Sequence, residues 1–231
     1  MTTHSEKTVG ELAAQSLAAT RVFEDHGIDF CCGGAKPFEE ACREKRLDPG
    51  NVLREVELAI AKEAAAPQDT DWNTAPFEKL IDHIVTRHHS YLREELPRLA
   101  SWIAAVRRAH GQRDGVVLEQ LDMVFAAMKD ELDQHIRKEE VILFPAILRS
   151  EGWISQPIAM MEYEHDSAGR ALAELRRLTE NYQLPAHACA TYRALYAGLA
   201  ALEADLHVHI HLENNILFPR AKADTNRSRG C

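Results

Sequence analysis

The amino-acid sequence predicts an all-α protein, with a small helical domain at the N-terminus and a four-helix bundle behind it. Helix-forming residues dominate, and the 231 residues include only 11 glycines and 9 prolines. No stretch alternates apolar and polar residues over the length of a strand. One helical pattern also occurs twice, 74 residues apart, as expected for a bundle built from two similar hairpins.

Composition and charge argue against several classes of protein. Apolar residues make up 45% of the chain, yet no apolar run reaches the ~18 residues of a membrane span. The first seven residues lack the apolar core of a signal peptide. The net charge of -9 argues against nucleic acid as a partner, and five cysteines, an odd number, argue against a secreted disulfide framework. We therefore expect a soluble, cytoplasmic protein that binds neither nucleic acid nor membrane.

The N-terminal domain is expected to span residues 1–62. Thr8 and Glu11 fit a capping box at the start of its first helix, and the glycines of DFCCGG, residues 29–34, favour a tight turn. Because about 60 residues form only a marginal core, we expect this domain to pack against the larger domain or a partner chain. Its helices are predicted over three ranges: residues 8–26, 37–46 and 49–62.

Two adjacent cysteines, Cys31 and Cys32, lie in that predicted turn. Neighbouring cysteines form only a strained disulfide, so we interpret them as candidate redox thiols that could pass electrons, receive a metal or bond another chain. The alternative is that both are small residues packed in a minor core. Cys42, Cys189 and Cys231 belong to no motif, and we assign them no role.

A linker of residues 63–76, which contains two prolines and no apolar stripe, is expected to precede the larger domain. The bundle should then span residues 77–222, and residues 223–231 should form a tail. The two hairpins and their bends are predicted as follows: residues 76–145 with a bend within 102–115, and residues 157–219 with a bend within 178–185.

The repeated pattern reads HIRKEEVILFP at residues 135–145 and HIHLENNILFP at residues 209–219. With the residues upstream, each copy forms one helical face that is apolar except for a histidine and a glutamate four residues apart. The two faces are Leu121, Phe125, Met128, Leu132, His135, Glu139 and Ile142, and Leu195, Leu199, Leu202, Leu206, His209, Glu213 and Ile216.

Each copy is expected to pair with the helix before it, which carries one further histidine. Apolar residues follow His89 and His165 at the same intervals of 3, 7 and 10 residues. Packing the four helices would bring four imidazoles and two carboxylates into one core, a ligand set suited to iron. We predict two metal ions, each held by two histidines and bridged by both glutamates. The predicted ligands are His89, His135, Glu139, His165, His209 and Glu213.

The alternative is that these are ordinary hydrogen-bonded core residues. A lone histidine on an apolar face usually is one, but glutamate is almost never buried without a partner. No lysine or arginine lies on the same stripes, so burying each carboxylate without a metal would destabilise the fold by several kcal/mol.

Neighbouring polar residues fall outside the predicted ligand set. Glu140 lies off the bundle-facing stripe and should be solvated, and His207 and His211 point away from the face of His209 and should lie on the surface. His88 is the alternative to His89 because it continues the upstream stripe, but the downstream spacing favours His89.

Two further glutamates are candidates for orienting a ligand. Glu131 lies one turn before His135, and Glu164 immediately precedes His165. Either could hydrogen-bond a ligand imidazole or line a polar path to the metals. The alternative is that both are solvated helix carboxylates.

The chain resembles the Repair of Iron Centers family, di-iron proteins with an ScdA-type N-terminal domain and a hemerythrin-like bundle. The motifs that carry the resemblance are TVGELA near the start, DFCCGG at 29–34, LIDHIVTRHH at 80–89, HIRKEEVILFP at 135–145, MEYEHD at 161–166 and HIHLENNILFP at 209–219. Transferred motif by motif, the family's ligands fall on the six residues predicted above, with His89 rather than His88.

The resemblance implies repair of iron–sulfur clusters damaged by nitric oxide or oxidants, with iron supplied by a non-haem di-iron centre that is oxo- and carboxylate-bridged. The implied partners are damaged iron–sulfur proteins. An electron donor and a second copy of the chain, in a homodimer, are further candidate partners. Two alternatives stay open, a nitric oxide reductase at the same site and a hemerythrin-like sensor of oxygen or nitric oxide. Whether the protein is an enzyme therefore also stays open.

Overall fold

The computed structural model describes residues 7–64 and 70–228, and its described residues confirm the all-α prediction. Apart from one isolated bridge between Thr8 and Pro37, the regular elements in this part of the chain are helices, with π-helical segments labelled η. In chain order they are α1 (Val9–Ala13), α2 (Leu17–Asp25), α3 (Phe38–Glu44), α4 (Pro49–Ala64), α5 (Phe77–His83), η2 (Ile84–His89), α6 (Ser90–Lys138), η3 (Glu139–Leu143), α7 (Phe144–Leu148), α8 (Ser155–Leu178), α9 (Ala190–His211), η4 (Leu212–Leu217) and α10 (Phe218–Ser228).

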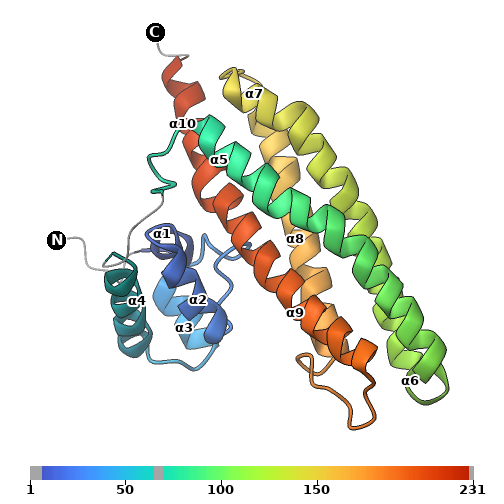
Figure 1. Cartoon of the computed structure of the whole chain (residues 1–231). Helices are drawn as coiled ribbons and strands as arrows, with labels where there is room; N and C mark the ends of the chain where they lie inside the picture. The colour runs from blue at the N-terminus through green and yellow to red at the C-terminus, as the bar shows by residue number, and fades with distance from the viewer. Residues whose placement is uncertain (1–6, 65–69, 229–231) are drawn as a thin grey trace. The chain divides into compact units, whose positions relative to one another are not determined.

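The chain divides into two compact units, and the larger is a helical bundle made of residues 82–149 and 153–206. The 49-residue α6 is interrupted at Asp114, whose φ of -111° and ψ of 18° are non-helical, so it folds back as two arms (Figure 1). The arms share a core with α8 and with the part of α9 in this unit, built from residues such as Leu96, Phe125, Leu172 and Leu199. The first predicted bend is thus confirmed.

The other unit comprises residues 1–81, 150–152 and 207–231, and it contains the short N-terminal helices. The predicted capping box is present, because Thr8 accepts from the backbone of Glu11 and Glu11 accepts from the backbone of Thr8. A single helix over residues 8–26 was the wrong prediction. The first helix ends at Ala13, and the side chain of Ser16 caps a separate helix, α2.

The small core of this unit reaches beyond the N-terminal helices. Phe23, Phe30 and Phe38 are fully buried, and Ile210 near the end of α9 packs into the same cluster. The end of α9 therefore adds apolar area to a core that about 60 residues alone would leave marginal. Asn73, within the predicted linker, also donates to the backbone oxygen of Ala14 at 2.6 Å.

Three π-helical segments shift the helical register along the bundle helices. A π-turn contains one residue more than an α-turn, so the buried stripe moves by one position across it. The prediction that Ile142 lies on the buried face is wrong for this reason, because after η3 begins Ile142 is 49% exposed and Leu143 is 1% exposed. In the second copy η4 makes the same shift, but both Ile216 and Leu217 are buried there, so the exposure of Ile142 also depends on what covers it.

The C-terminal part of the chain is helical further than the sequence predicts. Residues 223–228, predicted as a tail, are helical and continue α10, whereas Cys231 and part of the predicted linker lie outside the described residues. Among the described helices, none combines the length and the apolar character that crossing a membrane requires.

Candidate metal centre

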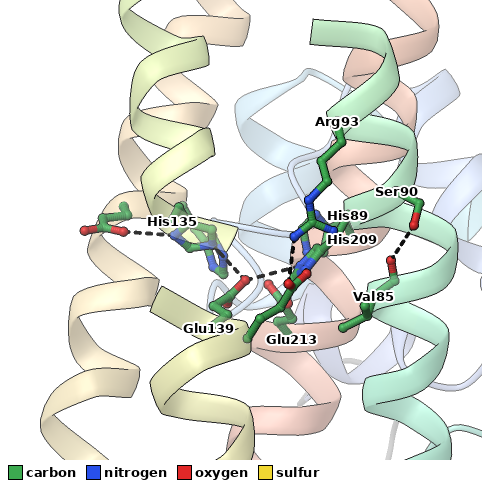
Figure 2. Close-up of polar contacts among 11 residues, drawn as sticks. Val85, His89, Ser90, Arg93, His135, Glu139, His209 and Glu213 are labelled. Atoms are coloured by element: carbon green, nitrogen blue, oxygen red, sulfur yellow. Dashed lines mark hydrogen bonds and ion pairs between the residues drawn. The ribbon is translucent and has the colours of Figure 1, made fainter. Parts of the chain in front are cut away.

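Four of the predicted ligands meet inside the bundle unit. His89 ends η2, His135 lies near the end of α6, Glu139 begins η3 and His165 lies in the middle of α8. All four are buried, and Glu139 is fully so. Its Oε2 lies 3.3 Å from Nε2 of His89 and 3.3 Å from Nε2 of His135 (Figure 2).

His165 joins this group through Nε2 of His135, the same atom that faces Glu139. The Nε2 atoms of the two imidazoles lie 3.0 Å apart. One ligand atom from each of His135, Glu139 and His165 lies within 4.8 Å of the others, a spacing at which the three could hold a metal ion. The site thus turns the Nε2 edges of its imidazoles and one carboxylate toward a common centre.

The outer nitrogens of two of these imidazoles are held by carboxylates. Glu140 accepts a hydrogen bond from Nδ1 of His89 at 2.8 Å, and Glu164 accepts one from Nδ1 of His135 at 2.9 Å. A carboxylate on the far nitrogen fixes the ring and directs the lone pair of Nε2 inward, as is usual for metal-bound histidine. The donor set and its orientation therefore fit a metal such as iron.

Basic residues in turn keep these two carboxylates ionised. Burial acts to raise the pKa of Glu140, but hydrogen bonds from Arg93 and His89 prevail and hold it below its ordinary value. The hydrogen bond with His135, together with one from Lys138, likewise lowers the pKa of Glu164. The prediction that Glu140 is solvated was wrong, because the arm that carries His89 packs against it and supplies Arg93.

The second copy of the repeat places His209 and Glu213 in the other unit. Nε2 of His209 lies 3.1 Å from Oε1 of Glu213, and both side chains are buried, to 1% and 0% exposure. His209 lies in α9 and Glu213 in η4, so a π-helical segment again contains the glutamate. The His–Glu pair therefore has the same local form in both copies.

The remaining candidates near the ligands have other partners. Glu131 is exposed and accepts a hydrogen bond from Ser167 at 3.0 Å. His88 is buried, and its Nδ1 lies 3.1 Å from the carboxylate of Asp205. Both His88 and His89 are buried because η2 shifts the register between them, so the upstream stripe leads to one and the downstream stripe to the other.

Cys31 and Cys32 lie in the N-terminal unit with their sulfurs 3.8 Å apart, and neither forms a disulfide among the described residues. One carboxylate oxygen of Asp29 accepts from the backbone of both cysteines and from the Cys31 thiol. The hydrogen bond with Cys32, burial and the nearby Asp29 raise the pKa of Cys31 well above its ordinary value. Cys42 is also buried and free, and burial raises its pKa.

Asn214 and Asn215 hold this cysteine loop against η4. Asn214 donates to the backbone oxygen of Cys31 at 3.3 Å, and Asn215 donates to that of Phe30 at 2.9 Å. A Cβ atom on Gly34 would lie 2.6 Å from Oδ1 of Asn215, so this position requires glycine for close approach. The sequence did not lead us to predict a role for either asparagine. The signal was present, because Asn214 and Asn215 stand in the second copy where the first copy has Glu140 and Val141.

The same contact corrects the prediction for His211 but not the one for His207. His211, expected on the surface, is fully buried, and Phe30 lies edge-on to it with 5.7 Å between ring centroids. Burial lowers the pKa of His211 to about 4. His207 is partly exposed and lies 3.7 Å from the carboxylate of Glu24. The N-terminal domain therefore covers the side of α9 that points away from His209.

Comparison with known proteins matches both parts of the chain. The model of the hemerythrin HHE cation binding domain matches residues 80–221, more than half of the chain, and ScdA_N, a domain of unknown function, matches residues 5–60.

Three relatives are similar over nearly the full length. They are a probable iron-sulfur cluster repair protein from Haemophilus influenzae, 41% identical over 94% of this chain and 96% of its own, the iron-sulfur cluster repair protein YtfE of Musicola paradisiaca, 41% identical over 94% and 97%, and that of Edwardsiella ictaluri, 42% identical over 96% and 99%.

Proposed function

The chain belongs to the bacterial iron–sulfur cluster repair proteins that join an ScdA_N domain to a hemerythrin HHE cation-binding domain, and on this premise we propose that it donates iron to damaged clusters. The damage is that caused by nitric oxide or oxidants. The donated iron would come from a di-iron centre with six protein ligands: His89, His135, Glu139, His165, His209 and Glu213.

The observation that carries this proposal is the fully buried carboxylate of Glu139 between two imidazole nitrogens at 3.3 Å. A carboxylate in that position is a natural bridge between two cations, each of which neutralises part of its charge. The internal repeat supports a second bridge, because Glu213 stands to His209 as Glu139 stands to His135. Four histidines and two carboxylates suit iron and leave coordination positions open for exchange.

Bound iron would be reducible, and imidazole and carboxylate would hold its Fe(II) form only moderately tightly. The iron could then pass to acceptors that offer thiolate or sulfide ligands. The protein's own groups control its release. Glu164 and Lys138 have side-chain exposures of 22% and 40%, so they connect the outer edge of His135 to solvent. We propose that Glu164 both orients His135 and lines the polar route by which iron leaves, with Glu131 further out on that route.

The cysteine pair is proposed as the redox part of the protein. Cys31 is buried with a raised pKa, so Cys32, which is partly exposed, is the thiol that would meet an electron donor or an acceptor metal. The proposal includes a cytoplasmic location, an electron donor and a homodimer as the form in which the protein acts.

The test is transfer of iron to a damaged enzyme. Reduced, iron-loaded protein is incubated with an iron–sulfur enzyme inactivated by nitric oxide, and enzyme activity, iron transfer and nitrous oxide are measured together. We expect activity to return with a matching loss of iron from the donor. Glu139→Leu should restore nothing, whereas Glu174→Leu, a change at an exposed carboxylate paired with Arg177, should act as wild type. Catalytic production of nitrous oxide without recovery would show a nitric oxide reductase instead.

A further inference from the structure

A second group of metal-binding side chains lies at the end of the bundle where α6 turns and where α8 is joined to α9 (Figure 1). Nε2 of His187 lies 2.7 Å from a carboxylate oxygen of Asp114. The rings of His110 and His187 are 5.7 Å apart, and one ligand atom from each of these three residues lies within 4.8 Å of the others.

A thiol lies beside His110, outside the set of three residues whose ligand atoms lie within 4.8 Å of one another. Cys189 is exposed and immediately precedes α9, where the first backbone N–H groups of a helix are free to bind an anion. Hydrogen bonds from the backbone of Tyr192, from His110 and from the backbone of Thr191 lower the pKa of Cys189 to about 7. The Cys189 sulfur is therefore exposed and lies beside one of the two histidines.

The group is independent of the candidate metal centre. His110 follows His89 by 21 residues and Asp114 precedes His135 by 21 residues, a distance of about 30 Å along either arm of α6. At that separation the two groups share no ligand and interact little through charge.

We propose a second metal site at this end of the bundle, a tetrahedral zinc site in which His110, Asp114 and His187 already lie together and Cys189, beside His110, supplies the fourth ligand. Imidazole, carboxylate and thiolate are the ligands that zinc takes in proteins, and four of them complete its preferred geometry. Three of the side chains are half-buried and the thiol is exposed, so an ion can enter without unfolding the bundle. A cavity of about 780 Å³ bounded by Asp114 and Tyr192 opens beside the group.

The site would tie together two connections that the sequence leaves far apart. Asp114 is the non-helical residue at the turn of α6, and His187 and Cys189 lie in the connection before α9. A shared zinc ion fixes both connections to each other, and it does so at the end of the bundle that carries no part of the proposed iron centre.

Cobalt and zinc binding to the iron-loaded, full-length protein tests this proposal. Cobalt reports its own ligands, because a tetrahedral site with a thiolate gives intense visible bands and a sulfur-to-cobalt charge-transfer band. We expect both signals with wild-type protein, their loss when zinc is added, and no change in iron content. A rise in melting temperature with zinc should accompany binding.

Variants separate a built site from casual binding. His187→Gln and Cys189→Ser should each weaken zinc binding by at least about tenfold, and Cys189→Ser should abolish the charge-transfer band. His26→Gln, at a half-buried histidine paired with Glu55 in the N-terminal unit, is the matched control and should bind as wild type. Circular dichroism and iron content of each variant show that it is folded.

Three results would overturn the proposal. Zinc that enters only as iron leaves would place it in the other centre. Equal zinc affinity in wild type, His187→Gln and Cys189→Ser would exclude these ligands. Failure of wild-type protein to bind cobalt or zinc would leave the His187–Asp114 contact as an ion pair that closes the end of the bundle.

Discussion

The two copies of the repeat contain the same histidine and glutamate but differ in what surrounds them. In the first copy, Glu140 follows the glutamate and accepts from Nδ1 of His89 and from Arg93. In the second copy the corresponding residue is Asn214, which donates to the backbone of Cys31. The proposed ligand is thus the same in both copies, while the residue after it has a different partner in each.

Positions two residues from the ligands differ in the same way. Arg137 of the first copy is exposed, whereas its counterpart His211 is fully buried under Phe30. Val141 is 67% exposed, and its counterpart Asn215 donates to a backbone oxygen of the cysteine loop. The comparison teaches that one copy is adapted to orient a ligand and the other to hold the small domain.

Replacing either of the two repeated glutamates should cause the largest loss of iron, and the loss should be similar in the two variants. Glu139→Leu and Glu213→Leu each remove a proposed bridge, so we expect each variant to lose most of its iron, measured as iron per chain after anaerobic loading. Glu174→Leu should keep its iron. Full iron binding in either ligand variant would contradict the proposed set and break the symmetry of the copies.

The residue after the glutamate should matter for iron only in the first copy. Glu140→Gln weakens the hydrogen bond that orients His89, and we expect iron affinity to fall by about 10- to 100-fold. Asn214→Ala, at the matching position, should leave iron affinity within about twofold of wild type. Competition with a coloured chelator measures both, and equal losses would show that the copies are not specialised.

The next position should matter for stability only in the second copy. Asn215→Ala leaves a buried backbone oxygen and the buried His211 without their amide partner, so the free energy of unfolding should fall by about 1–3 kcal/mol. Val141→Ala changes an exposed side chain and should cost less than about 0.5 kcal/mol. Denaturant unfolding of the two variants gives the comparison directly.

The smallest expected effect is a change in thiol reactivity. With no zinc added, alkylation of Cys189 should speed up as the pH rises through about 7, where its thiol ionises, and level off above. Cys31 should react slowly at the same pH because its pKa is raised. In Asn215→Ala the Cys31 rate should rise relative to that of Cys189, measured by peptide mass spectrometry. An unchanged ratio would mean that Asn215 does not keep the loop closed.

The pattern of the chain was sufficient for the fold class, for the hairpins and for the candidate His–Glu pairs. These features depend on spacing within one helix, where residues four apart always share a face. The same rule failed at Ile142, because the π-helical segment η3 adds a residue to a turn. At η2 the added residue is also the reason that the upstream spacing favoured His88 and the downstream spacing favoured His89. No feature of the local sequence predicts that insertion.

The sequence by itself therefore determined the helices of the bundle, their repeat and the residues proposed to bind iron, since all three follow from helical periodicity. Tertiary structure decided which outward faces are covered: it buried His211 beneath the small domain and brought Glu140 to His89. It also joined His110 and Asp114 to His187, which follows more than 70 residues later and lies outside the repeat. Such contacts depend on how distant helices pack, and periodicity within one helix contains no information about that packing.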